Sequence, residues 1–307
     1  MRNNKEKKVI SAVVYLYNNE SVIVPFLKKI TTILDDLFEA VEVIIVNDAS
    51  TDNSLKVIRN CNELKQFKIS ILQMSFHQGL EVSMTAGVDL SLGDFIYEFD
   101  DLVIDYNLSA IEESYRLLIK DNDIVNVSPS KSNSLVSSLF YKVYNYFSIS
   151  GYEIQSDRFR ILSRRAINRA YSISKSIPYR KALYANSGLK IGSIKYLPNK
   201  SRERSTNFFR NKMAINSLII YTNLAFHISI AITLLLFLFT LGTTIYTLII
   251  YLGNSKPIEG WTTLMILISG SFSGLFFLLA IVIKYLSLLV ELVYSKKAYL
   301  FESINKN

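Results

Sequence analysis

The first 157 residues alternate continuous apolar runs with amphipathic stretches. Continuous apolar runs are typical of buried parallel strands, because such strands are covered on both faces. Four runs predict strands, at 9–16, 41–46, 68–74 and 95–99. Helical spacing lies between them, at 21–38, 54–64 and 82–90. The pattern predicts an α/β fold with an open, mainly parallel Rossmann-like sheet, helices on both faces and a ligand site at the carboxyl ends of the strands.

Two apolar segments near the end of the chain, 226–252 and 262–290, are each long enough to span a bilayer, which takes about 20 residues. The short polar turn between them predicts a transmembrane helical hairpin. Ahead of it, residues 207–223 mix apolar and basic side chains. This stretch is either an interfacial helix or an extension of the first span.

Four parts of the chain are therefore expected: 1–157, an α/β domain; 158–224, a basic segment with a juxtamembrane helix; 225–294, the hairpin; and 295–307, a tail. Basic residues flank the hairpin mainly on one side. By the positive-inside rule, both termini and the large domain are expected on the cytoplasmic side of the inner membrane.

The net charge of +8 is unevenly distributed. Residues 158–212 hold fifteen Lys or Arg and a single acid, Glu203, which gives +14, whereas 1–157 carry 14 basic and 22 acidic residues, or −8. A strongly basic segment before an apolar hairpin indicates phosphates and anionic lipid as partners rather than nucleic acid. One cysteine excludes an intramolecular disulfide and a cysteine-cluster zinc site, and two histidines disfavour a histidine-rich metal site.

Polar residues follow each predicted strand, and three of the four strand ends carry carboxylates. The loops read YNNE from Tyr17, NDASTD from Asn47, HQG from His77 and DDLVID from Asp100. Carboxylates gathered at one edge of a sheet suit Mg²⁺ or Mn²⁺ bridging a diphosphate. Neither GxGxxG nor GxxxxGK[ST] is present, which disfavours an ordinary dinucleotide site and a P-loop.

The runs VVYLYNNE, VEVIIVNDASTDNS and HQGLEVSMTAGVDLSLGDFIYEFDD, followed by RFRILSRRAINRA and the hairpin, are the basis of a family resemblance. In this order they resemble the family 2 inverting glycosyltransferases of GT-A fold, in particular the membrane-anchored dolichol-phosphate mannose synthases and undecaprenyl-phosphate glucosyltransferases. The resemblance implies transfer of a sugar from a UDP- or GDP-linked donor to a polyprenyl (undecaprenyl) phosphate at the cytoplasmic membrane face, for envelope polysaccharide.

The same resemblance implies that 1–157 is the nucleotide-sugar-binding domain and 158–224 the acceptor segment, and it implies roles for individual residues. The residues expected to contact the nucleotide sugar are Leu16, Tyr17, Glu20, Asp48, Ser50, Asp100, Arg202 and Arg204. The residues expected to bind the acceptor phosphate are Arg160, Arg164 and Lys142. The metal ligands are expected to be Asp100 and Asp101, and the catalytic residues Asp100, Asp105 and Arg160. A turn or capping role is the competing interpretation for Asp48 and is favoured for Asp52.

Three departures from the family pattern bear on function. Tyr15 stands where a proline is usual, and Arg158 where an acid precedes FR. Leu102 replaces the second acid of the DxD motif. Either Asp101 or Asp105 substitutes for that acid, or metal binding is weak, or the chain is a catalytically silent scaffold that binds nucleotide sugar or lipid. A processive polysaccharide synthase is disfavoured by the two spans and by the lack of a QxxRW motif, and a homo-oligomer is compatible with the sequence.

Overall fold

The computed structural model describes residues 5–130, 135–147, 152–173, 179–198, 260–294 and 301–306, with single positions between 228 and 242. The chain divides into two compact units. One comprises Met1–Tyr146, Ser150–Ala214 and Lys296–Asn307, and the other comprises Phe147–Ile149 and Ile215–Ser295.

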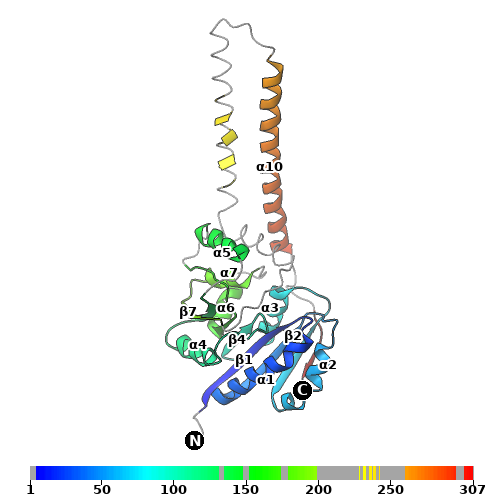
Figure 1. Ribbon diagram of the computed structural model, residues 1–307, viewed down its shortest axis with the longest axis vertical. Helices are drawn as coiled ribbons and strands as arrows, with labels where there is room; N and C mark the ends of the chain where they lie inside the picture. Colours follow the sequence, from blue (N-terminus) through cyan, green and yellow to red (C-terminus); the bar gives the residue numbers. More distant parts are fainter. Residues whose placement is uncertain are drawn as a thin grey trace. The chain divides into compact units, whose positions relative to one another are not determined.

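The first unit is built on an eight-stranded mixed sheet with strand order β7-β5-β6-β4-β1-β2-β3-β8 (Figure 1). Neighbouring strands are parallel in the pairs β1–β2, β2–β3, β1–β4 and β5–β7, and antiparallel in β4–β6, β5–β6 and β3–β8. The strands are β1 Glu6–Leu16, β2 Phe38–Asn47, β3 Lys68–Met74, β4 Phe95–Phe99, β5 Ile124–Pro129, β6 Phe159–Ser163, β7 Ile191–Tyr196 and β8 Phe301–Lys306.

The four predicted strands are confirmed as the parallel block β3-β2-β1-β4 at the centre of the sheet. The predicted helices at 21–38 and 82–90 match α1 and α3, while 54–64 divides into α2 and a 3-10 turn, because Cys61 takes an extended conformation between them. The helices of the first unit are α1 Glu20–Leu37, α2 Ser54–Arg59, η1 Asn62–Gln66, α3 Leu80–Leu90, α4 Ser109–Ile119, α5 Leu135–Phe147, α6 Arg164–Ile173 and α7 Arg180–Ala185.

Helices cover both faces of the sheet, as the sequence predicts. Successive residues of a strand point to opposite faces. Val14 and Ile45 pack with Phe26 of α1 in one core cluster, whereas the adjacent Val13 and Val46 belong to a second cluster with residues of α3, α6 and α7. In Figure 1, α1 lies along the strands β1 and β2. The central strands are thus buried on both sides, which explains their continuous apolar runs.

The sheet extends past the boundary predicted at residue 157. Strand β6 pairs antiparallel with β4, and β7 pairs with β5, so residues 159–196 belong to the same sheet as the first 157. The predicted tail contains β8, which pairs with β3. Hydrogen-bonded strand pairing therefore unites parts that the charge distribution separates.

The second unit contains α10, a helix of 34 residues from Trp261 to Tyr294, which covers the second predicted span. In the part of the chain that the structure describes, no helix is both long and apolar enough to cross a membrane. The predicted interfacial helix at 207–223, as well as Arg202 and Arg204, lies outside the described residues, and so does most of the first span.

Gly87 of α3 lies directly against the sheet, and its replacement by alanine is expected to destabilise the fold. A Cβ atom there would approach Val13 Cγ1 and Val46 Cγ2 to 2.5 Å each. Overpacking of a buried contact costs about 1–3 kcal/mol. Thermal unfolding of Gly87→Ala should show a lowered Tm. Because Ala86 on the same helix already carries a Cβ, Ala86→Gly serves as the comparison, and an unchanged Tm for Gly87→Ala would contradict the close approach.

Candidate active site

The strand order places a topological switch point between β1 and β4, the position at which open α/β sheets have their binding crevice. From β1 the chain proceeds to β2 and β3 on one side, then returns to place β4 on the other side of β1. In open α/β sheets, ligands bind outside the carboxyl ends of the strands at such a switch point. The loops that meet there begin at Tyr17 after β1 and at Asp100 after β4, the predicted positions.

The loops after β1 and β2 are tied together by side-chain hydrogen bonds. Asn18, with φ of 49°, accepts the Thr51 backbone N–H at 2.8 Å, and the Asn18 N–H donates to Ser50 Oγ at 3.1 Å. Asp52 accepts the N–H groups of Glu20 and Ser54, both at 3.0 Å. The geometry favours the loop-fixing interpretation of Asp52.

Glu20 and Ser50 are predicted to contact the nucleotide sugar, and their side chains also take part in these hydrogen bonds between the loops. The Glu20 carboxylate accepts the Asn53 N–H at 2.9 Å. The Ser50 hydroxyl accepts the Asn18 N–H. Both side chains therefore already fix the conformation of the crevice wall, whatever else they contact.

Asp48, predicted to contact a base or ribose, is fully buried and surrounded by internal donors. Its carboxylate accepts the N–H groups of Gln78 and Gly79 at 2.7 and 2.8 Å and the Tyr15 hydroxyl at 2.9 Å, and it lies 2.9 Å from His77 Nδ1. Burial, together with the nearby carboxylate, raises the pKa of Tyr15 above its ordinary value. Asp48 thus fixes the loop after β3 against β1, and a ribose would have to displace one of these donors.

Tyr17 and His77 present an aromatic surface at the crevice. Their rings stack with centroids 4.2 Å apart and an angle of 26° between the planes. Leu16, the last residue of β1, has a fully buried side chain, and its carbonyl accepts the Asp48 N–H at 2.9 Å. Of these two predicted contacts with the nucleotide sugar, Tyr17 has a partly exposed side chain, whereas that of Leu16 is buried.

A buried ion network lies under the loop after β4. Glu98 has no exposure, and directly opposite it on β6 stands Arg160. Buried charges persist in proteins when they are paired and hydrogen-bonded. We call this cluster the buried ion network; its members are Glu81, Glu98, Asp100, Asp157, Arg160, Arg180, Lys181 and Tyr184.

Arg160, predicted to bind the acceptor phosphate, is 1% exposed, and each of its guanidinium nitrogens donates to a carboxylate. Nε reaches Asp157 at 2.9 Å, Nη1 reaches Glu98 at 2.8 Å and Nη2 reaches Asp100 at 2.5 Å. A phosphate would have to compete with three carboxylates. In this structure Arg160 positions Asp100.

Arg180, at the start of α7, provides the second cation of the network. It donates from Nε to Glu81 at 2.9 Å, from Nη1 to Glu98 at 2.7 Å and from Nη2 to Asp100 at 2.6 Å. Burial opposes the charge of Asp100, but Arg160 and Arg180 outweigh that effect and hold the pKa of its carboxyl well below the ordinary range. Asp100 is therefore a fixed, ionised acceptor at the switch point.

A second group, the Arg158 cluster, consists of Arg158, Asp101, Asp105 and Tyr196. Arg158 Nε lies 2.9 and 3.0 Å from the two Asp105 oxygens, and Nη1 donates to Asp101 at 3.0 Å. Tyr196 donates to Asp105 at 2.5 Å. Both carboxylates that could substitute for the missing second acid are thus paired with the arginine that departs from the family pattern.

The remaining predicted residues are not brought to this site by contacts in the described part of the chain. Arg164 donates to the carbonyl oxygens of Ser91 and Gly93, at the amino end of β4 and so at the opposite end of that strand from Asp100. Lys142 is exposed on α5.

Several residues of the site had no role in the sequence interpretation. Glu98 could have been noticed, because a carboxylate inside the apolar run FIYEF requires a partner. No local signal marks Glu81, Arg180 or Tyr184, since their partners lie far away in the chain.

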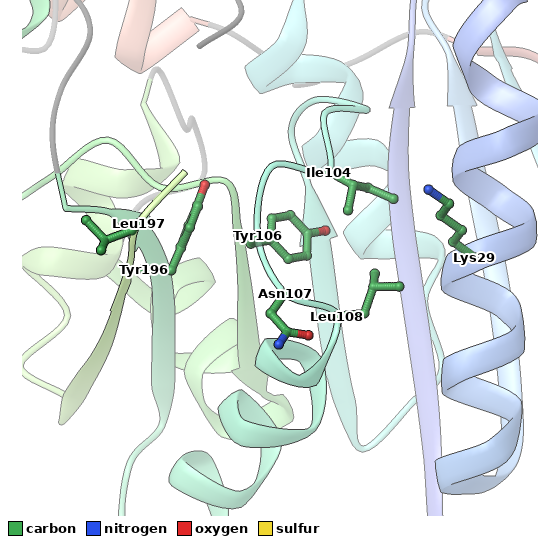
Figure 2. A pocket seen from close by; sticks show the side chains of 7 residues that line it. All are labelled: Lys29, Ile104, Tyr106, Asn107, Leu108, Tyr196 and Leu197. Carbon is green, nitrogen blue, oxygen red and sulfur yellow. The ribbon is translucent and has the colours of Figure 1, made fainter. Parts of the chain in front are cut away.

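A cavity of about 560 Å³ opens beside the Arg158 cluster. Figure 2 shows its lining: the loop after β4, the end of β7 and one lysine of α1. Tyr196 belongs to both the cavity and the Arg158 cluster. The lining residues are Lys29, Ile104, Tyr106, Asn107, Leu108, Tyr196 and Leu197.

The paired carboxylates predict that acid destabilises the fold. Burial raises the pKa of Asp100, Asp105 and Asp157, yet their cationic partners outweigh burial and lower it overall. An unfolded chain with ordinary values, near 3.9, binds more protons in acid, so this stability is present above about pH 4 and lost as pH falls toward the folded values. Urea denaturation midpoints should be level from pH 7 to 5 and decline below about pH 4.

The variant Asp105→Asn provides the comparison for the acid series. Its amide cannot be protonated in this range, so its decline should be shallower than that of the native chain. Equal midpoints at pH 5 and pH 3 for the native chain would contradict the ionised state of these carboxylates.

The fold and the crevice place the chain among α/β proteins that bind a ligand at the carboxyl ends of parallel strands. Residues 11–186, more than half of the chain, match Glycosyl transferase family 2, and the chain belongs to this family. The resemblance found in the sequence is thereby confirmed.

Relatives and solved structures are similar at low identity. "Uncharacterized glycosyltransferase YkcC" of Bacillus subtilis (strain 168) is 24% identical over 66% of this chain and 64% of its own length. Undecaprenyl-phosphate 4-deoxy-4-formamido-L-arabinose transferase of Aeromonas hydrophila is 29% identical over 32% of this chain and 30% of its own. The chain thus matches less than two thirds of the length of these relatives.

Among solved structures, the mannosyltransferase PcManGT of Pyrobaculum calidifontis, in complex with GDP-Man and Mn²⁺, is 14% identical with a TM-score of 0.49, covering 70% of this chain and 63% of that one.

Proposed function

We propose that the protein transfers a sugar from a UDP- or GDP-linked donor to a polyprenyl phosphate, such as undecaprenyl phosphate, at the cytoplasmic face of the membrane, with inversion at the anomeric carbon. The observation that carries the proposal is the ionised Asp100 at the β1–β4 switch point of a family 2 glycosyltransferase fold. The product would serve envelope polysaccharide synthesis or modification.

The donor would lie in the crevice. The stacked rings of Tyr17 and His77 offer a flat surface for a nucleobase. Asp100, held by two guanidinium groups, offers oxygens that accept hydrogen bonds from ribose or sugar hydroxyls. Mg²⁺ or Mn²⁺ at Asp100 and Asp101 stays a prediction, since both carboxylates already pair with arginines.

The acceptor side of the proposal is supported by composition and by the names of distant relatives. A polyprenyl phosphate oxygen is ionised near neutral pH, because the second pKa of a phosphate monoester is about 6, so it needs little help from a base. In-line attack by that oxygen on the anomeric carbon expels the nucleoside diphosphate and inverts the configuration. The basic stretch 158–212 and the two apolar segments suit a lipid phosphate at an anionic leaflet.

The test is a transfer assay with the purified full chain, undecaprenyl phosphate and a panel of UDP- and GDP-sugars. Release of nucleoside diphosphate together with a glycolipid detected by mass spectrometry is the expected result. Water and a polyprenol without phosphate serve as the control acceptors in place of undecaprenyl phosphate. Donor hydrolysis without a glycolipid would remove the lipid acceptor from the proposal.

A catalytically silent scaffold is the second candidate, and Leu102 favours it. This side chain is 6% exposed and belongs to the apolar core, where the resemblance implies an acid. Binding of nucleoside diphosphate in calorimetry without turnover of any donor would support the scaffold.

A further inference from the structure

Arg158 stands between the two acids of the loop that follows Asp100. Its Nη1 atom donates to Asp101 at 3.0 Å, while Nε and Nη2 both donate to Asp105. The side chains of Arg158 and Asp105 are 8% and 2% exposed, and that of Asp101 is 26% exposed. Arg158 and the two acids therefore form a mostly buried ion triad, in which only Asp101 is partly exposed to solvent.

The residues present do not fit a divalent cation in this arrangement. Mg²⁺ and similar ions take oxygen ligands at about 2.0–2.1 Å, and carboxylates are the usual protein contribution. At Asp101 and Asp105 the positive charge of a guanidinium already occupies the space between the carboxylates, and an added cation would be repelled by it.

A further observation agrees with that misfit. Leu102 has an apolar, buried side chain at the position of the second acid.

A guanidinium can supply the positive charge that an anionic donor requires. Arginine stays charged at every physiological pH, and its planar fork binds carboxylate and phosphate oxygens through paired hydrogen bonds. Arg158 leads directly into β6, which pairs with β4, so the backbone fixes it beside the loop that carries Asp100 and Asp101. Its position is thus set by the sheet rather than by a bound ion.

We propose that the Arg158 guanidinium is a built-in counter-cation, which takes the place of a divalent metal ion beside Asp101 and Asp105, so that the donor diphosphate binds without metal. The inference rests on the proposed function in one respect: it takes a nucleoside diphosphate as the ligand of the crevice. Arg158 then holds the two acids together and offsets half of their negative charge, which weakens their repulsion of the donor.

The test measures binding of UDP and GDP to the full chain by calorimetry, in EDTA and in Mn²⁺. For the native chain the Kd is expected to agree within about threefold between the two conditions. Arg158→Ala should bind at least tenfold more weakly in EDTA and regain affinity in Mn²⁺, because Asp101 and Asp105, no longer paired with Arg158, then recruit the ion. Arg116→Ala, which removes an exposed ion pair with Glu112 on α4, is the matched control and should behave as the native chain.

A tenfold loss of native affinity in EDTA would overturn the proposal, and so would an Arg158→Ala variant equal to the native chain in EDTA. If Arg158→Ala fails to fold, judged by circular dichroism, the native measurement decides alone.

Failure of the proposed function gives a different result, in which neither nucleotide binds under either condition. Mn²⁺ binding to the protein, measured by electron paramagnetic resonance, then tests the proposed role of Arg158 independently of any nucleotide. Uptake of Mn²⁺ by the native chain overturns it, and uptake by Arg158→Ala but not by the native chain supports it.

Discussion

Replacing Arg160 by methionine is expected to lower the free energy of unfolding by about 3–5 kcal/mol, the cost of breaking a buried ion pair from one side. Methionine retains much of the side-chain volume but leaves Glu98, Asp100 and Asp157 without one of their partners. Arg180 and Lys181 remain, so the network is weakened rather than emptied of positive charge. Chemical denaturation of the full chain, followed by circular dichroism, measures the effect.

The matched control for this prediction is Arg116→Met, because Arg116 also pairs with a carboxylate, Glu112 on the same helix, but both side chains are exposed, by 69% and 40%. Exposed pairs contribute little, so its denaturation midpoint should stay close to that of the native chain. Equal midpoints for Arg160→Met and Arg116→Met would show that Arg160 is not needed for the fold. Its role as a residue that positions Asp100 would then be untenable.

Conversion of Asp100 to asparagine should reduce sugar transfer by about 10²-fold or more, the usual effect of losing one preorganised electrostatic contact in an active site. The amide keeps the shape of the side chain and one oxygen for Arg160 or Arg180. It removes the negative charge that those two arginines hold in place at the switch point. The rate of nucleoside diphosphate release per enzyme, with saturating acceptor, is the measurement.

Asp121→Asn is the control for the charge change itself, because Asp121 forms an exposed ion pair with Lys190, in the loops that precede β5 and β7. It should transfer at the native rate. If Asp100→Asn stays within about threefold of the native rate while its Tm is unchanged, Asp100 is not part of the transfer site.

The central part of the fold could be predicted because its signal is local. The four apolar runs became the strands β1 to β4, and residues 68–74 and 95–99 match β3 and β4 at both ends. A strand buried on both faces has a continuous apolar run in any context, so its position follows from the run alone. Because β1 and β4 are parallel neighbours, the loops that begin at Tyr17 and Asp100 then lie at the same end of the sheet.

The partners of the site could not be predicted because they depend on distant register. Arg180 meets Glu98 across 82 positions, and Arg158 meets Asp105 across 53. In the sequence, Arg158 stood out only as a departure from the family pattern. The resemblance assigned Arg160 to binding of the acceptor phosphate. The antiparallel pairing of β6 with β4 decides both outcomes, since it sets Arg160 opposite Glu98 inside the sheet. The residues around Phe159 form no local pattern that predicts this strand pairing.

Strand β8 has a consequence for the order in which the molecule is made. Ile71 of β3 pairs with Asn305, so one edge of the sheet is completed by residues that leave the ribosome more than 200 positions later. Until then β3 presents an open edge, which other chains can pair with. The nascent protein therefore has to keep that edge protected while every segment between Met74 and Phe301 is being synthesised. Removal of residues 301–306 would make this transient exposure permanent.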